Sequence, residues 1–192
     1  MVPTGSRGVA SPAPEGVSRL ALDGSLNGHY VEVILRLGPL QRVLLGDLLS
    51  PARIRIPLKG RDKEAVLGEL VHAVADGGGQ YDDILRAVRA REALLSTGIG
   101  YGVAIPHGKS PTLPDLRLAA GVAAQPIAFE SLDGQPVSLF FLLVGPESAS
   151  GAHVKALSRI SRLVRREPFR QRLLVCRDPD EFYRFLCDAE RS

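Results

Sequence analysis

Hydrophobic and polar residues follow a regular pattern from about Leu44 onward, and this pattern predicts where helices and strands lie. Apolar residues three and four positions apart predict a helix after Asp62, whose carboxylate can cap the helix N-terminus. Its inward stripe consists of Val66, Leu67, Leu70, Val71 and Val74. Asp76 and the three glycines after it are expected to end this helix. A second helix is predicted over residues 81–94, with Ile84, Leu85 and Val88 pointing inward.

Alternating and continuous apolar segments predict the strands. Ile54 and Ile56 alternate with arginines, which is typical of a half-buried strand. Two more strands are predicted over residues 118–123 and 137–144, and the second run is apolar enough to be covered on both faces. We therefore predict an α/β fold, a single-domain sandwich in which a mixed, mostly buried β-sheet is flanked by helices on both faces.

Three helices are predicted in the last third of the chain. The first is expected to begin with Ser150 as its cap and to bury Val154, Leu157, Ile160 and Val164. A shorter helix is predicted over residues 168–175. The last is expected to start at Asp178, with Pro179 in its first turn, and to reach Leu186.

The N-terminal segment differs from the rest in composition. Residues 1 to about 24 are rich in Gly, Ser, Pro and Ala, which predicts disorder. Residues 29–37 contain enough apolar residues for a strand, but no neighbouring segment completes a structural unit. We expect a disordered arm over residues 1–42 and one domain over residues 43–189.

Composition excludes several classes of protein. With 45% hydrophobic and 23% charged residues, the 192-residue chain resembles ordinary soluble domains. No apolar run approaches the roughly 20 residues that span a bilayer, and no secretory signal is evident, so membrane insertion is not expected. Cys176 and Cys187 lack metal-ligand spacing, which favours a reduced, cytoplasmic location.

The net charge is +3, and much of the positive excess lies in one C-terminal cluster of arginines. No aromatic residues alternate with these arginines and no nucleic-acid-binding motif accompanies them, so nucleic acid is not an expected partner. The cluster predicts a solvated helix face or a docking patch for an acidic partner. Its members are Arg159, Arg162, Arg165, Arg166, Arg170 and Arg172.

The most distinctive segment reads S-T-G-I-G-Y-G-V-A-I-P-H-G and spans residues 96–108. Its alternating glycines allow close backbone packing and positive φ angles. An apolar stretch and Pro106 lead to His107, and Gly108 follows at once, an arrangement expected to hold the imidazole at the rim of the core with open space in front. A neutral histidine nitrogen is a nucleophile near pH 7, although a lone histidine after an apolar run is more often structural.

Several other polar residues make an anion-handling set with His107. Arg91 and the hydroxyls of Ser96 and Thr97 precede it, and His153 falls in the first turn of a predicted helix. An arginine fork and loop N–H groups would stabilise phosphoryl oxygens on the imidazole without a metal. The alternatives are that Arg91 forms a simple ion pair and that His153 is a surface residue.

Known cofactor motifs are missing from the sequence. The histidines lack the spacing of metal ligands, and no carboxylate cluster accompanies them. The glycine-rich run is not followed by the Gly-Lys-Ser/Thr of a nucleotide-binding loop, and it does not open a helix as a dinucleotide-binding fingerprint does. We expect neither a metal nor another cofactor.

The segment R-E-A-L-L-S-T-G-I-G-Y-G-V-A-I-P-H-G-K, residues 91–109, resembles the active-site signature of the type-2 IIA domains of the bacterial phosphoenolpyruvate-dependent phosphotransferase system. The resemblance continues through residues 126–146 and through G-A-H-V-K-A-L-S-R-I, residues 151–160, and covers about residues 44–188. Tyr101 departs from it, since a small polar residue is often found there. The family fold, a mixed sheet flanked by helices, agrees with the predicted elements.

The resemblance implies a role for each candidate residue. His107 would be the phospho-accepting histidine, Arg91 a mobile phosphate-stabilising arginine and His153 the second active-site histidine, while Ser96, Thr97 and Gly98 would bind phosphate. The chain would be a cytoplasmic phosphohistidine phosphocarrier. Its phosphoryl donor would be an HPr-like phosphocarrier protein.

The resemblance leaves two functions open. In a nitrogen-regulatory IIA protein, which the motif resembles slightly more, the phosphorylation state would decide which kinase or transporter is bound. In a sugar-specific, fructose-type IIA subunit, the phosphate would pass to a separate IIB component for sugar uptake. Both functions use the same site residues.

Overall fold

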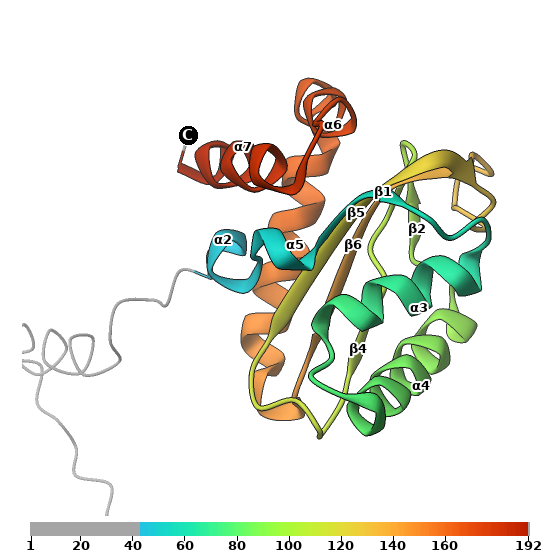
Figure 1. The fold of residues 1–192 in the computed structure, drawn as a ribbon, viewed down its shortest axis with the longest axis vertical. Coiled ribbons are helices and arrows are strands. Elements are labelled where there is room, and N and C mark those ends of the chain that lie inside the picture. Colours follow the sequence, from blue (N-terminus) through green and yellow to red (C-terminus); the bar gives the residue numbers. More distant parts are fainter. Residues whose placement is uncertain (1–42, 192) are drawn as a thin grey trace, which may run out of the picture. The chain divides into compact units, whose positions relative to one another are not determined.

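Helices cover both faces of a six-stranded mixed sheet (Figure 1) in the computed structural model, which describes residues 43–191. The expectations for residues 1–42 lie outside the described residues. The strands are β1 (Ile54–Leu58), β2 (Gly98–Gly100), β3 (Val103–Ala104), β4 (His107–Lys109), β5 (Arg117–Ile127) and β6 (Val137–Gly145). The helices are α2 (Leu45–Leu48), α3 (Lys63–Val74), α4 (Gly78–Leu94), α5 (Ser150–Arg165), α6 (Glu167–Leu174) and α7 (Pro179–Arg191).

Strand β6 organises the sheet. The strand order is β1-β5-β6-β3-β2, and β4 also pairs with β6. β5 runs antiparallel to β6, whereas β3 and β4 run parallel to it. The register places His107 of β4 opposite Leu143 of β6, so the histidine backbone is anchored to the most buried strand.

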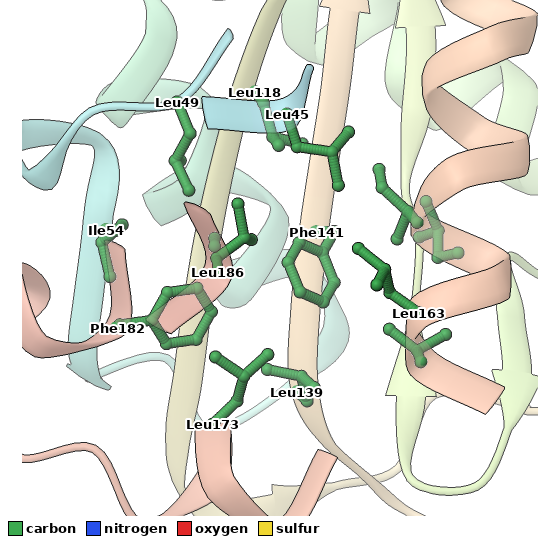
Figure 2. Packing of buried hydrophobic residues seen from close by; sticks show 14 of the residues in the cluster. Leu45, Leu49, Ile54, Leu118, Leu139, Phe141, Leu163, Leu173, Phe182 and Leu186 are labelled. Atoms are coloured by element: carbon green, nitrogen blue, oxygen red, sulfur yellow. The ribbon is translucent and has the colours of Figure 1, made fainter. Parts of the chain in front are cut away.

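The apolar residues of β6 contribute to two hydrophobic cores. Leu139, Phe141 and Leu143 pack with α2, α5, α6 and α7 on one face, as Figure 2 shows for Phe141. Phe140 and Leu142 pack with α3 and α4 on the other face. Because alternate side chains of a strand point to opposite faces, a strand covered on both sides reads as a continuous apolar run. The predicted fold class is confirmed.

Side chains cap two helices as predicted. The Asp62 carboxylate accepts a hydrogen bond from the N–H of Ala65 at 2.8 Å, and that of Asp178 accepts from Glu181 at 2.8 Å. The prediction for Ser150 is wrong, because Ser150 is the first residue of α5 and Ala149 occupies the cap position. The Ser150 hydroxyl instead donates to the carbonyl of Glu147, which closes the preceding 3₁₀ turn.

The inward face of α5 also differs from the prediction. Val154 is 66% exposed, and its neighbour His153 is only 4% exposed. The buried residues are His153, Ala156, Ile160, Leu163 and Val164, which lie on one stripe at helical spacing. Hydrophobicity alone places Val154 rather than the polar His153 on the inward stripe, and the structure shows the opposite arrangement.

The glycine-containing boundary between α3 and α4 is also shifted. Helix α3 ends at Val74, and α4 begins at Gly78, three residues before the predicted start. The glycines at positions 78 and 79 thus form the first turn of α4 rather than the end of α3. Gln80 accepts a hydrogen bond from the N–H of Asp76 at 2.6 Å, which holds the link between the helices.

A buried carboxylate joins the first and last described helices. Glu190 of α7 is 6% exposed and accepts hydrogen bonds from the N–H groups of Leu45 at 2.8 Å and Gly46 at 2.9 Å. It also forms an ion pair with Arg159 of α5. These contacts satisfy N–H groups at the start of α2 that have no partner within the helix.

The C-terminal arginines have different partners. Arg170 donates to the carbonyls of Val164 and Arg165 at the end of α5, and Arg172 pairs with Glu181 at 2.6 Å. Arg162, Arg165 and Arg166 are exposed. Cys176 and Cys187 are free thiols. Across residues 43–191, none of the helices is long and apolar enough to cross a membrane.

Candidate functional site

Three elements bring the predicted site residues together. Arg91 comes from the C-terminal end of α4, His107 from the start of β4, and His153 from the first turn of α5. Gly108 allows α4 to lie directly on β4, because a Cβ atom there would come within 3.0 Å of the Val88 nitrogen. Arg91, one turn beyond Val88, therefore reaches His107. The backbone of α4 therefore fills the space that a side chain at Gly108 would need.

Two hydrogen bonds define the tautomer of His107. Its Nδ1 lies 2.9 Å from the carbonyl oxygen of Ile105, and its Nε2 lies 3.0 Å from Nε of Arg91. A carbonyl oxygen only accepts, so Nδ1 carries the proton. An arginine Nε only donates, so Nε2 holds a lone pair. The nitrogen of His107 that carries the in-plane lone pair is therefore Nε2.

The surroundings keep His107 neutral. Burial lowers the pKa of His107 below its usual value of 6.5, and the positive charge of Arg91 lowers it further. The hydrogen bond to Ile105 and the charge of Glu92 act in the opposite direction. At neutral pH the imidazole thus has a lone pair on Nε2 that can attack an electrophile, once Arg91 leaves it.

Arg91 is held at two points. Its Nη1 donates to the carbonyl oxygen of Leu95 at 2.9 Å, while its Nε donates to His107. The Leu95 carbonyl lies just beyond the end of α4, where the last carbonyls of a helix lack partners within it. A guanidinium has five N–H donors, so Arg91 keeps further donors for an anion.

His153 faces His107 from the first turn of α5. The two ring centroids are 5.9 Å apart with planes at 65°. Burial is the main cause that lowers the pKa of His153 to about 4, and the charges of nearby His107 and Lys109 lower it further. This ring is therefore also neutral at pH 7. Its Nδ1 is buried and has no hydrogen-bond partner among the described residues. A buried polar atom without a partner costs free energy, and native structures rarely leave one without a functional reason.

A lysine next to the site was missed by the sequence analysis. Lys109 lies two residues after His107 on β4, so both side chains project from the same side of the strand. Its ammonium pairs with Glu147 at 2.7 Å. The tripeptide strand is too short to show an alternating pattern, so no periodic signal marked Lys109 as a neighbour of the histidine.

The hydroxyls and N–H groups predicted to bind phosphate are engaged within the protein. The Ser96 hydroxyl donates to the carbonyl of Phe129 at 2.9 Å and accepts from the N–H of Gly98 at 3.2 Å. The N–H and hydroxyl of Thr97 both donate to the carboxylate of Glu92. The position of Glu92 four residues after Val88 is the sequence signal that it faces inward.

The glycine-rich run forms a turn between β2 and β3. Gly100 and Gly102 have φ angles of 88° and 70°, as the alternating glycines predicted. Tyr101 between them has φ of 58°, and its N–H donates to Asp133 at 2.9 Å. Its ring is 64% exposed and stacks on the guanidinium of Arg170, 5.0 Å away.

The charge pattern of the site suits an anion. Arg91 and Lys109 flank a pair of neutral imidazoles, and the carboxylates nearby, Glu92 and Glu147, are each paired with a lysine. Within residues 43–191, no group of three or more His, Cys, Asp or Glu side chains is arranged to hold a metal ion.

Comparison with known proteins identifies the family. Residues 47–189 match the family described as "Phosphoenolpyruvate-dependent sugar phosphotransferase system, EIIA 2". The chain belongs to this family. It is a IIA phosphocarrier component of that phosphotransferase system, and the resemblance stated from the sequence is confirmed.

Individual relatives agree with this assignment. A nitrogen regulatory protein of Bradyrhizobium diazoefficiens is 43% identical over 141 residues, which cover 73% of this IIA chain and 92% of the relative. A fructose-specific EIIABC component of Bacillus subtilis is 38% identical over 137 residues. The match covers 70% of this chain but only 21% of the longer Bacillus protein.

Solved structures show the same fold. The nitrogen regulatory protein IIA-Ntr from Neisseria meningitidis superposes with a TM-score of 0.70 and 30% identity, covering 74% of the IIA chain and 98% of that structure. The IIA mannitol structure from Escherichia coli gives a TM-score of 0.59 at 18% identity, covering 72% and 98% of the two chains. The second likeness concerns the fold alone.

Proposed function

We propose that this IIA chain is a phosphocarrier of the nitrogen-regulatory type that accepts a phosphoryl group on Nε2 of His107. The observation that carries the proposal is the pair of hydrogen bonds that place the His107 proton on Nδ1 and the lone pair on Nε2. The regulatory type is favoured because nitrogen regulatory proteins are among the most similar relatives, at 43% and 34% identity.

The transfer needs no proton movement in its first step. The Nε2 lone pair attacks the phosphorus of a phosphohistidine donor, and the new N–P bond forms as the donor N–P bond breaks. The bonding electrons leave with the donor nitrogen, while the His107 proton stays on Nδ1. An HPr-like phosphohistidine protein is the proposed donor, since histidine-to-histidine transfer matches the leaving group to the nucleophile.

Arg91 and His153 are proposed to bind the phosphoryl oxygens. Arg91 must leave the Nε2 lone pair before the attack, and its guanidinium then pairs with the oxygens at the same place. The unpartnered Nδ1 of His153 supplies a second polar contact. For Ser96, Thr97 and Gly98, phosphate binding stays a prediction, because their donors are engaged elsewhere in this conformation.

Labelled phosphate from an HPr-like donor tests the acceptor. Wild-type protein should form an acid-labile adduct, and His107→Ala should form none while keeping its far-UV circular dichroism. His153→Ala should still accept label but pass it on poorly. Label on the His107→Ala variant would reject His107 as the acceptor.

A second transfer experiment distinguishes the sugar-specific alternative from the regulatory function. The similarity to a fructose-specific EIIABC component is the observation that favours it. If the labelled protein passes its phosphate to a purified fructose-type IIB component, the chain serves sugar uptake. Retention of the label, with binding to a kinase or transporter that depends on phosphorylation, supports the regulatory function.

A further inference from the structure

Glu92 is a buried carboxylate that the phosphoryl-transfer proposal does not use. It follows Arg91 on the last turn of α4 and is 7% exposed. A carboxylate at such a position costs free energy unless its oxygens are bound and its charge is balanced. Lys63 of α3 supplies the balancing charge, with its Nζ 2.8 Å from Glu92.

Thr97 supplies the remaining contacts of this carboxylate. The Thr97 N–H lies 3.1 and 3.0 Å from the two oxygens of Glu92, and its hydroxyl donates to one of them. Thr97 is itself 4% exposed. Two donors from one residue therefore bind the Thr97 backbone to the end of α4.

The hydrogen bonds continue from Thr97 to His107. The carbonyl of Thr97 accepts from the N–H of Ile105 at 3.0 Å, and the carbonyl of Ile105 accepts from Nδ1 of His107 at 2.9 Å. The backbone of Thr97 thus connects the Glu92 carboxylate with the segment that orients the imidazole. A displacement of Thr97 would move Ile105 and change the contact that holds the Nδ1 proton.

We infer that Glu92 is a positioning residue for His107, acting through Thr97 and Ile105. By fixing Thr97, it keeps the Ile105 carbonyl against Nδ1 and so presents the lone pair of Nε2 to phosphorus. Glu92 forms no hydrogen bond with the imidazole, and it is not a catalytic residue. The inference rests on the proposed function, in which Nε2 of His107 is the phosphoryl acceptor.

The structure offers a matched control for Glu92. Glu130 also pairs with Lys63, at 2.8 Å, but its side chain is 83% exposed and has no hydrogen bond to Thr97. Glu92→Gln and Glu130→Gln both remove one carboxylate charge from the same lysine. Only Glu92→Gln replaces an acceptor of Thr97, because an amide offers one accepting oxygen where the carboxylate offers two.

Two measurements on the full-length protein test the inference. Nitrogen-15 shifts of the His107 ring report the tautomer in unphosphorylated protein, and kcat and KM report phosphoryl transfer from a phosphorylated HPr-like protein. Glu92→Gln should shift the ring population away from the Nδ1–H form and lower kcat about 10-fold to 100-fold with KM unchanged. Glu130→Gln should match wild type in both measurements.

Variants of Thr97 decide the matter if Glu92→Gln does not fold. Thr97→Val removes the hydroxyl donor and should shift the His107 tautomer in the same direction to a smaller degree, while Thr97→Ser keeps the hydroxyl and should show the wild-type tautomer. Wild-type behaviour of Glu92→Gln, or of Thr97→Val in its place, overturns the inference. A change in KM alone also overturns it, because that result indicates a role in partner docking.

The tautomer measurement separates this inference from the proposed function. It requires no phosphorylation, so it reports on Glu92 even if another residue proves to accept the phosphate. A wild-type protein with the Nδ1–H form at His107 but no phosphate on it would reject the proposed function alone. A wild-type His107 ring that lacks the Nδ1–H form would overturn the inferred positioning role of Glu92.

Discussion

Nε of Arg91 donates a hydrogen bond to Nε2 of His107 at 3.0 Å, so the guanidinium covers the lone pair that would attack phosphorus. The same contact keeps a positive charge where phosphoryl oxygens would arrive. In the proposed transfer, Arg91 would protect the nucleophile before a donor docks and would lie beside the reacting group afterwards. Replacing the guanidinium tests both consequences.

We expect Arg91→Lys to slow phosphoryl acceptance by about 10²–10³-fold, because a lysine cannot contact two oxygens with a planar fork. The rate of label transfer from an HPr-like donor measures the effect. Arg89→Lys is the control, since Arg89 is an exposed residue of the same helix that pairs with Glu64. Equal rates for Arg91→Lys and wild type would show that Arg91 has only a structural role.

Gly108→Ala should separate α4 from β4. The added Cβ would meet backbone atoms of Ala87 and Val88 at 3.0–3.3 Å, and a helix backbone yields only by moving. We expect a loss of about 1–3 kcal/mol in unfolding free energy and a transfer rate lowered roughly 10-fold, because Arg91 moves with the helix. Urea unfolding and label transfer measure the two effects.

Gly79→Ala provides the opposite case on the same helix. A Cβ at Gly79 meets nothing within 4 Å, so alanine should raise the unfolding free energy by up to about 1 kcal/mol. Its transfer rate should equal that of wild type. If Gly108→Ala behaved like Gly79→Ala, close contact between α4 and β4 would not be needed for the site.

Acid should destabilise the protein through His153. In the unfolded chain this histidine binds a proton near pH 6.5, whereas its folded pKa is about 4. Between these values the unfolded state binds more protons, so stability falls as the pH drops from about 6.5 to 4 and loses nothing more from this group below that. The loss is at most about 3.4 kcal/mol.

Urea unfolding of wild type and His153→Gln from pH 7 to pH 4 measures this contribution. The variant lacks the titrating ring, so the unfolding free energy of wild type should fall more than that of the variant as the pH drops from 7 to 4. Burial also lowers the pKa of His107, and this contribution has the same sign in both proteins. Parallel curves for the two proteins would contradict the assignment to His153.

Glu190→Ala should lower the unfolding free energy by about 3–5 kcal/mol, since it leaves Arg159 partly buried without its carboxylate. It also removes the acceptor for the N–H groups of Leu45 and Gly46. Asp83→Ala, which breaks an exposed pair with Arg86, should cost no more than about 1 kcal/mol. Similar losses in both variants would show that the buried pair is no stronger than a surface pair.

Long periodic segments predicted most of the fold. The stripe of α3, its Asp62 cap and the apolar run of β6 each depend on local spacing, which the sequence displays directly. Strand β4 has three residues and no visible period, so its pairing with β6 depends on distant contacts. Sequence periodicity therefore indicated the scaffold better than the short strands at the site.

The site itself was predicted as a set of residues but not as a geometry. His107, Arg91 and His153 were singled out by chemistry and resemblance, yet the tautomer of His107 depends on a carbonyl two residues away. Hydrophobicity did not predict the inward direction of His153, because histidine is more polar than the neighbouring Val154. The hydrogen bonds between Glu92 and Thr97 have no local spacing signal either, because Thr97 lies beyond the end of α4.

The contact between Glu190 and the start of α2 has a consequence for how the chain is synthesised. Residues 45 and 46 leave the ribosome well before their acceptor is synthesised, because 145 and 144 positions separate them from Glu190. The described domain therefore completes this contact only after residue 190 has been synthesised. A product that stops before residue 190 contains every residue of the histidine site, but it cannot close the two ends of its fold.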